Sequence, residues 1–202
     1  MMLDGAGVHA ALSALGEQLE HGDAEPVEMI VCGGAALQAL GLISRATRDV
    51  DVLALVAGRL PDVRPADPLP DPVVQAAALV ARDLGLPADW LNAGPTDLLS
   101  EGLPDGLLDR LHSRRYGAKL AAHFVDRFDQ VCFKAYAAIN GGSAHHLSDL
   151  QVLRPSEEEM LFAARWCLTQ DASKEFPMLV RSFLEKMDYR NVARTLGTED
   201  EK

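Results

Sequence analysis

The feature that most constrains this chain is a pair of glycines between apolar segments, followed some fifteen residues later by two closely spaced aspartates. The run Val31-Cys-Gly-Gly-Ala-Ala-Leu predicts a strand at 29–32, a turn at Gly33 and Gly34, and a short helix from residue 35 to about 40. Glycines let backbone amides approach a phosphate closely, and the first turn of a helix carries partial positive charge. The turn therefore predicts a site for the β and γ phosphates of a nucleotide.

The aspartates stand at the start of a second apolar strand, in the run Asp49-Val50-Asp51. Side chains two residues apart on a strand leave the same face, so the two carboxylates are placed to share a pair of divalent ions, Mg²⁺ or Mn²⁺. Arg45 and Arg48 precede them and would neutralise charge on a triphosphate. The whole pattern predicts metal-assisted phosphoryl chemistry.

The order of these parts resembles the nucleotidyltransferase superfamily, whose polymerase-beta-like fold carries a Gly-Gly or Gly-Ser turn before a strand with Asp-x-Asp. Gly33, Gly34, Asp49 and Asp51 occupy those positions. Gly-Gly-Ala-Ala-Leu with Arg-x-Thr-x-Asp-Val-Asp-Val is most similar to small bacterial stand-alone members related to the AbiEii toxins, over about residues 29–56. The resemblance implies a minimal nucleotidyltransferase fold of the α/β (α+β) class, a small mixed sheet flanked by helices, with a helical C-terminal part.

The same resemblance implies two active-site residues further along the chain. AbiEii-like members carry a lysine in a later helix and an Asp-Leu pair beyond it, and Lys134 and Asp149 occupy these places. Lys134 lies in an otherwise apolar helical run, where a lysine either extends to solvent or faces negative charge in a pocket. Superfamily members usually bring a third carboxylate from a later strand, and the candidates here are Asp126 and Asp149.

Composition limits the classes of function. A chain of 202 residues with 48% hydrophobic content is able to bury a sizeable core, and its net charge of −11 opposes a broad contact with duplex DNA. No apolar run approaches the length of a membrane span, and the N-terminus lacks the pattern of an export signal. Three separated cysteines in apolar surroundings suit a reducing compartment. We therefore expect a cytoplasmic globular protein with no membrane partner.

The remaining pattern predicts an α/β core over residues 1–126 and a helical part over 127–202 packed on it. Five prolines between residues 57 and 72 predict a long surface loop, and Trp90 is expected either in the core or stacked on a base. The basic residues at 110–115 are either a solvated face or a contact for phosphate. The other expected elements are helices ending near residue 22 and over 72–85, a strand at 116–125, and helices at 127–139, from 156, and at 176–187. Ser156 and Glu159 predict a capping box at the start of the helix from 156.

Three classes of function remain open from the sequence. The first is an active, toxin-like nucleotidyltransferase that moves a nucleoside monophosphate from a nucleoside triphosphate to a hydroxyl of an RNA end or a protein. The second is a nucleotide-binding regulatory relative that has lost catalysis. The third is an unrelated enzyme or interaction domain in which Asp49 and Asp51 cap an element or form ion pairs with Arg45 and Arg48.

Overall fold

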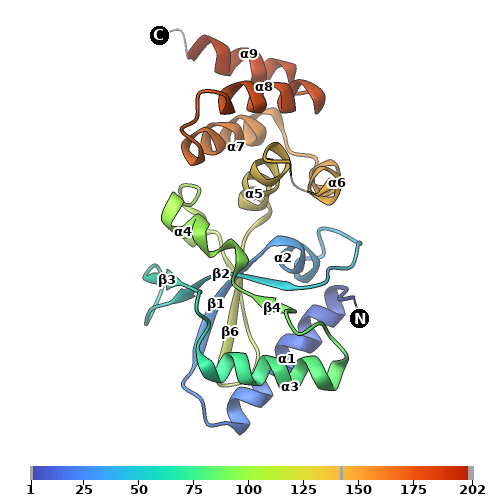
Figure 1. Ribbon diagram of the computed structural model, residues 1–202, viewed down its shortest axis with the longest axis vertical. Helices are drawn as coiled ribbons and strands as arrows, with labels where there is room; N and C mark the ends of the chain where they lie inside the picture. The colour runs from blue at the N-terminus through green and yellow to red at the C-terminus, as the bar shows by residue number, and fades with distance from the viewer. Residues whose placement is uncertain (1, 142, 200–202) are drawn as a thin grey trace. The chain divides into compact units, whose positions relative to one another are not determined.

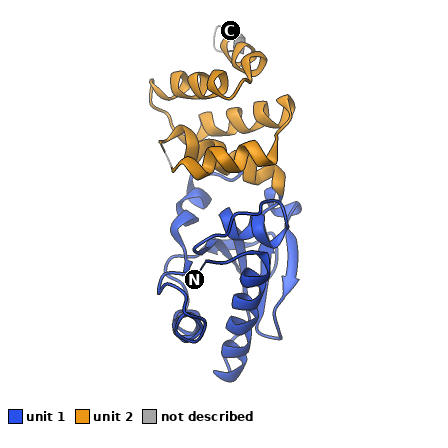
Figure 2. Cartoon of the chain, turned by 90° about the vertical axis from the view of Figure 1, so that its right-hand side faces the viewer, with its two compact units in different colours: residues 1–126 blue, residues 127–202 orange. Residues whose placement is uncertain are grey.

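The computed structural model describes residues 2–141 and 143–199, and the chain divides into two compact units, residues 1–126 and 127–202 (Figure 2). The first unit holds a small mixed sheet with helices, and the second is helical, which confirms the predicted fold class. Within the described ranges, none of the helices combines the length and apolar character that crossing a membrane requires. The predicted packing of one unit on the other stays a prediction.

A mixed sheet, six-stranded within residues 2–141, forms the centre of the first unit (Figure 1). Five strands lie in the order β3-β2-β1-β6-β5, and β4 pairs with β2 beside this path. β1 runs parallel to β6 and antiparallel to β2, so the carboxyl ends of β1 and β6 meet the beginning of β2 at one edge. The strands are β1 (Val27–Cys32), β2 (Val50–Val56), β3 (Val63–Pro65), β4 (Leu91–Asn92), β5 (His112–Arg115) and β6 (Leu120–Phe124).

Two helices, α1 (Gly5–His21) and α3 (Asp71–Leu84), pack with one face of the sheet (Figure 1). The sequence ends each helix as expected, with Gly22 after α1 and a left-handed Gly85 after α3. Trp90 lies wholly within this core and donates its indole N–H to the carbonyl of Ala77 at 2.9 Å. The alternative prediction, that Trp90 stacks on a base, is therefore wrong. The remaining short elements are α2 (Gly33–Ala39), η1 (Gly94–Asp97), α4 (Leu98–Glu101) and η2 (Leu107–Asp109).

Two sequence predictions need correction in this unit. The proline-rich segment is not all loop, because residues 63–65 pair with β2 as a short edge strand. Pro65 is compatible with that position, since an edge strand leaves one row of backbone groups outside the ladder. The strand predicted at 116–125 begins only at Leu120, because Gly117 adopts a left-handed φ of +81° in a turn that connects β5 to β6. The basic cluster predicted at 110–115 lies partly in β5, whose residues are exposed.

The second unit consists of helices packed through apolar and aromatic side chains. Trp166 contacts the rings of Phe133 and Tyr136, with centroid distances of 5.5 and 5.8 Å. The predicted helix at 127–139 is confirmed, and His145 and His146 lie within a helix that begins at Ala144. The helices are α5 (Arg127–Ile139), α6 (Ala144–Leu153), α7 (Glu157–Gln170), α8 (Phe176–Lys186) and α9 (Arg190–Glu199).

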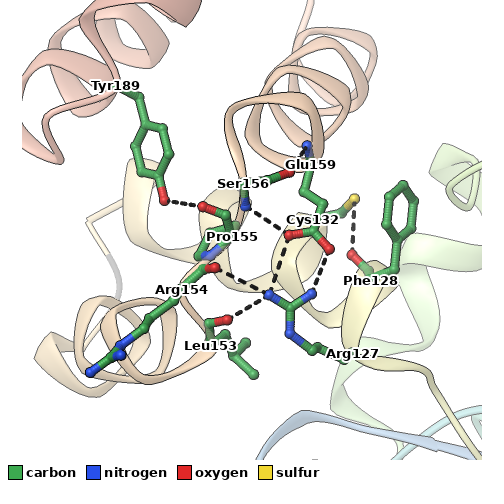
Figure 3. A network of polar contacts seen from close by, with 9 residues as sticks. All are labelled: Arg127, Phe128, Cys132, Leu153, Arg154, Pro155, Ser156, Glu159 and Tyr189. Atoms are coloured by element: carbon green, nitrogen blue, oxygen red, sulfur yellow. Dashed lines mark hydrogen bonds and ion pairs between the residues drawn. The ribbon is translucent and has the colours of Figure 1, made fainter.

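A polar network joins the ends of three of these helices (Figure 3). Arg127 makes a two-point ion pair with Glu159, at 2.5 and 3.2 Å, and also donates to the carbonyl of Leu153 at 2.5 Å. Glu159 accepts from the backbone of Ser156 at 2.8 Å, while the Ser156 hydroxyl accepts from the Glu159 N–H at 3.1 Å. This is the predicted capping box. Arg127, at the start of α5, is therefore bound to the start of α7 through Glu159 and to the end of α6 through the Leu153 carbonyl.

A second polar contact lies at the edge of the first unit's core. His9 and Tyr116 are hydrogen-bonded through Nδ1 and the hydroxyl at 2.5 Å. Burial, followed by the positive charge of Arg114, lowers the pKa of His9, and a backbone contact with Ala39 partly opposes this shift. Burial also raises the pKa of Tyr116 to about 12, so the phenol donates to the neutral imidazole. Protonation of His9 would oppose this arrangement.

The pH dependence of stability tests that coupling. The unfolded chain takes up a proton on His9 near its usual pKa of 6.5, whereas the folded chain does so only at lower pH. The stability that depends on a neutral His9 is therefore fully present above pH 6.5, and it is lost as the pH falls toward the pKa of His9 in the folded chain. Urea unfolding from pH 8 to pH 5 should show a smaller loss of stability in His9→Gln than in wild type. His21→Gln, at an exposed position of the same helix, is the control; equal pH slopes in all three proteins would contradict the coupling.

Candidate functional site

The predicted glycine turn and aspartate strand are in direct contact. β1 ends at Cys32 and α2 begins at once with Gly33, whose φ of +70° is left-handed. A Cβ atom at Gly33 would overlap the carboxylate of Asp51, and one at Gly34 would lie 2.7 Å from the Thr47 hydroxyl oxygen. Both glycines are thus required by how closely the turn approaches the second segment. α2 has only seven residues, so its dipole is small, and the close approach of the turn to Asp51 and Thr47 is the main structural feature of this site.

Asp51 lies at the junction of three strands. It pairs with Cys32 of β1 on one side and with Asn92 of β4 on the other. The Asn92 amide donates to Asp51 Oδ1 at 3.1 Å, and its carbonyl oxygen accepts from the backbone of Gly94 at 2.9 Å. Asn92 therefore orients the carboxylate and is itself held by the chain that follows it.

Asp49 precedes β2 and is positioned through Thr47. The Thr47 hydroxyl lies 3.3 Å from Asp49 Oδ1, and the threonine is buried, with 5% of its surface exposed. Its backbone exchanges two hydrogen bonds of 2.7 Å with Leu3. Since Asp49 and Asp51 are both half-buried and flank the buried Val50, they present two carboxylates at the same edge of the sheet.

The two predicted arginines lie in different surroundings. The Arg45 guanidinium lies near Gly34, with Nη2 3.6 Å from the position of a Cβ there, and the Gln38 side chain donates to the Arg45 carbonyl. Arg48 instead pairs with Asp89 at 3.3 Å, and both side chains are largely exposed. An exposed pair of this kind contributes about 0–1 kcal/mol. The structure thus brings Arg45, but not Arg48, against the glycine turn.

The donor set suits a magnesium ion bound together with phosphates. Among the described residues, no group of three or more His, Cys, Asp or Glu side chains gathers as a metal cage. Mg²⁺ in phosphoryl-transfer sites usually takes one or two protein carboxylates and completes its shell with water and substrate oxygens. Asp49 and Asp51, two half-buried carboxylates beside the glycine turn, fit that requirement.

Asp126, a candidate third carboxylate, lies at the same edge of the sheet. The N–H of Val125 donates to the carbonyl of Val31 at 2.9 Å, so the chain after β6 runs beside the end of β1. The side chain of Asp126 is 27% exposed and accepts a 2.7 Å hydrogen bond from His112 Nε2. The first unit therefore contains a carboxylate two strands from Asp51, a separation of roughly 10 Å at the usual strand spacing.

Lys134 and Asp149, the remaining predicted site residues, form a buried ion pair in the second unit. Their charged groups are 3.0 Å apart, and the side chains are 5% and 2% exposed. The alternative prediction, that Lys134 extends to solvent, is therefore wrong. A partner of this kind compensates the charge of Lys134, so the pair joins α5 to α6 whatever further role it has. Their predicted part in nucleotide chemistry stays a prediction.

Known proteins add no information on this arrangement. No family model matches the sequence, and searches of the curated proteins and of the solved structures give no match. The site is therefore interpreted from its own residues. Sequence reasoning missed the part played by Asn92, although it follows a tryptophan and leucine in a short apolar segment; the role of Thr47 becomes clear only from its contact with Gly34.

The contact between the turn and the second segment is testable by a double-mutant cycle. Gly34→Ala places a methyl group 2.7 Å from the Thr47 hydroxyl oxygen and should cost about 1–3 kcal/mol of stability. Thr47→Ala removes the hydroxyl group at 2.7 Å and leaves the Thr47 Cβ at 3.1 Å, so the double variant should lose less than the sum of the single losses. Urea unfolding of all four proteins measures this, with Gly22→Ala as the control because its Cβ meets ordinary contacts from 3.5 Å outward. Strictly additive losses would contradict the contact.

The buried pair in the second unit gives a separate prediction. Lys134→Met leaves the Asp149 carboxylate buried without its cation and should cost about 3–5 kcal/mol, whereas Lys134→Met/Asp149→Leu should recover most of that loss. Thermal or urea unfolding provides the measurement, and Lys174→Met, at an exposed position, controls for loss of a lysine. A Lys134→Met protein as stable as wild type would show that the pair contributes nothing.

Proposed function

We propose that the chain is a metal-dependent nucleotidyltransferase that moves a nucleoside monophosphate from a nucleoside triphosphate to an acceptor hydroxyl. The observation that carries the proposal is the packing of Gly33 and Gly34 against Asp51 and Thr47. The glycine turn and two carboxylates suited to Mg²⁺ or Mn²⁺ then occupy one edge of the sheet. A glycine turn or a pair of aspartates alone is common in proteins, whereas the contact between them supports one site that binds both phosphate and metal.

In this proposal each residue has a defined task. The β and γ phosphates lie against the backbone of the turn at Gly33 and Gly34, approached from the half-buried Gly33, and Arg45 adds positive charge beside Gly34. Asp49 and Asp51 hold the metal ion, which when bound neutralises charge on the reacting phosphates. Asn92 keeps Asp51 in the orientation that faces the turn.

The acceptor would enter from the side of the sheet edge that carries Asp126. An in-line attack of its hydroxyl on the α-phosphorus breaks the bond to pyrophosphate, and a nearby base receives the hydroxyl proton. Asp126, already hydrogen-bonded to His112, is the base that the first unit offers. An RNA end or a protein hydroxyl is the proposed acceptor, as in a toxin-like enzyme.

The second candidate is a nucleotide-binding regulatory protein without catalysis. Two observations favour it: Asp149 is buried and paired with Lys134, and β1 lies between the strand of Asp51 and the strand that precedes Asp126. Both candidates require the same phosphate and metal site. They differ only in whether the bound nucleotide is transferred.

Nucleotide binding tests the shared site. Isothermal calorimetry should detect a nucleoside triphosphate in the presence of Mg²⁺ or Mn²⁺, and the heat should disappear in EDTA and in Asp49→Asn/Asp51→Asn. Asp105→Asn, an exposed carboxylate in the same unit, should bind as wild type does. Tight binding that needs no metal and survives the double substitution would refute the site.

Transfer separates the two candidates. Each of the four nucleoside triphosphates, labelled at the α-phosphate, is incubated with the protein and with cellular RNA and protein fractions. Label that enters a macromolecule and depends on Asp49 and Asp51 supports the transferase. Metal-dependent binding without transfer supports the regulatory protein.

A further inference from the structure

A second set of hydrogen-bonded polar side chains crosses three neighbouring strands of the sheet. The Ser113 hydroxyl lies 2.7 Å from His123 Nδ1, and His123 Nε2 lies 2.9 Å from Glu28 Oε2. The three residues come from neighbouring strands, β5, β6 and β1, and Ser113 is directly opposite His123 in the register. A hydroxyl, an imidazole and a carboxylate in this order form the arrangement that activates a serine as a nucleophile.

The carboxylate determines where the imidazole proton resides. An ionised carboxylate only accepts hydrogen bonds, so Nε2 must donate to Glu28. When the ring is neutral, Nδ1 then has its lone pair directed at the Ser113 hydroxyl, which donates to it. His123 is therefore held in the tautomer that accepts the serine proton.

The three side chains differ in solvent exposure as a reactive serine and its base require. The side chain of His123 is 8% exposed and that of Glu28 is 37% exposed, whereas Ser113 is exposed. The base is thus shielded from water and fixed from two sides, while the hydroxyl is open to a reagent.

The strand register adds a hydrogen-bond donor beside the hydroxyl. The backbone N–H of Tyr116 donates to the Leu120 carbonyl at 2.8 Å, so Tyr116 and Leu120 form a hydrogen-bonded pair of the antiparallel ladder. Hydrogen-bonded and non-hydrogen-bonded pairs then alternate along the β5–β6 hairpin. Ser113 and His123 form a non-hydrogen-bonded pair, so the backbone N–H of Ser113 is directed away from β6. Because β5 is the last strand of the sheet, that N–H faces outward, where it is placed to stabilise negative charge developing on a carbonyl oxygen.

We propose that Ser113 is the nucleophile of a second site, which reacts with activated esters and is independent of the nucleotide site. The Ser113 oxygen bonds to the acyl carbon, the ester C–O bond breaks, and the hydroxyl proton passes to His123 Nδ1 and from there to the departing alcohol. A water molecule then repeats the sequence, bonding to the acyl carbon and releasing the acid and free Ser113. Glu28 remains ionised throughout and is a positioning residue.

A fluorophosphonate probe tests the nucleophile directly. Attack by the Ser113 oxygen forms an O–P bond and expels fluoride, so the adduct is found by mass spectrometry of the intact protein and of its peptides. We expect one adduct on Ser113 in wild type and none there in Ser113→Ala. Ser100→Ala is the control, because Ser100 is also exposed but donates to the Asp97 carbonyl at 2.8 Å rather than to a histidine.

Variants of the other two groups test activation. His123→Gln should slow the labelling by about 10²–10⁴-fold, the usual contribution of a general base. Since His123 is buried, Glu28→Gln at a half-exposed position is the second variant, and it should slow labelling with little change in melting temperature. Asp105→Asn, which removes an exposed carboxylate of the same unit, should be labelled at the wild-type rate. Absence of a Ser113 adduct, or equal rates in wild type and Glu28→Gln, would overturn the proposal.

Discussion

The architecture of the first unit depends on how closely two glycines approach the strand beside them. Gly33 and Gly34 leave no space for a side chain because Asp51 and Thr47 occupy it. That contact sets the end of β1 against the beginning of β2, and the same edge receives Asn92 from β4 and the chain after β6. A side chain at either glycine would separate the glycine turn from Asp51 and Thr47, so the fold and the candidate site depend on the same steric condition.

The sequence predicted well those features that local chemistry decides. The glycine after α1, the left-handed Gly85 after α3 and the reciprocal bonds of Ser156 with Glu159 each satisfy backbone groups within a few residues, so their signals are visible in a short window. Gly33, Gly34, Asp49 and Asp51 were also predicted as a group, and the structure brings the turn against the Asp51 strand. The order of residues alone was sufficient for this because the two segments are adjacent in the chain as well as in the sheet.

Features that arise from distant partners were not predictable in this way. Asn92 orients Asp51 across 41 positions of sequence, and nothing near Asn92 indicates that partner. The turn at Gly117 divides an apolar segment that reads as one strand, because its left-handed conformation depends on the hairpin and not on hydrophobicity. Lys134 lies in a run whose character suits either solvent exposure or burial, and only the proximity of Asp149 on another helix decides between them. Pairings between separated segments follow from the fold, so they become visible only with it.

The composition of the two outer strands has a consequence for behaviour at high concentration. β5 ends the sheet on one side with four exposed polar residues, two of them arginines. On the other side β2 is bordered by β3, three residues that include Pro65, and by the two residues of β4. Strands of separate molecules add to one another through open backbone groups, but charged side chains repel a matching strand and proline offers no N–H. Each edge therefore carries its own barrier to growth of the sheet from one copy into the next. The sheet is able to keep backbone donors accessible at its border without becoming a template for fibres.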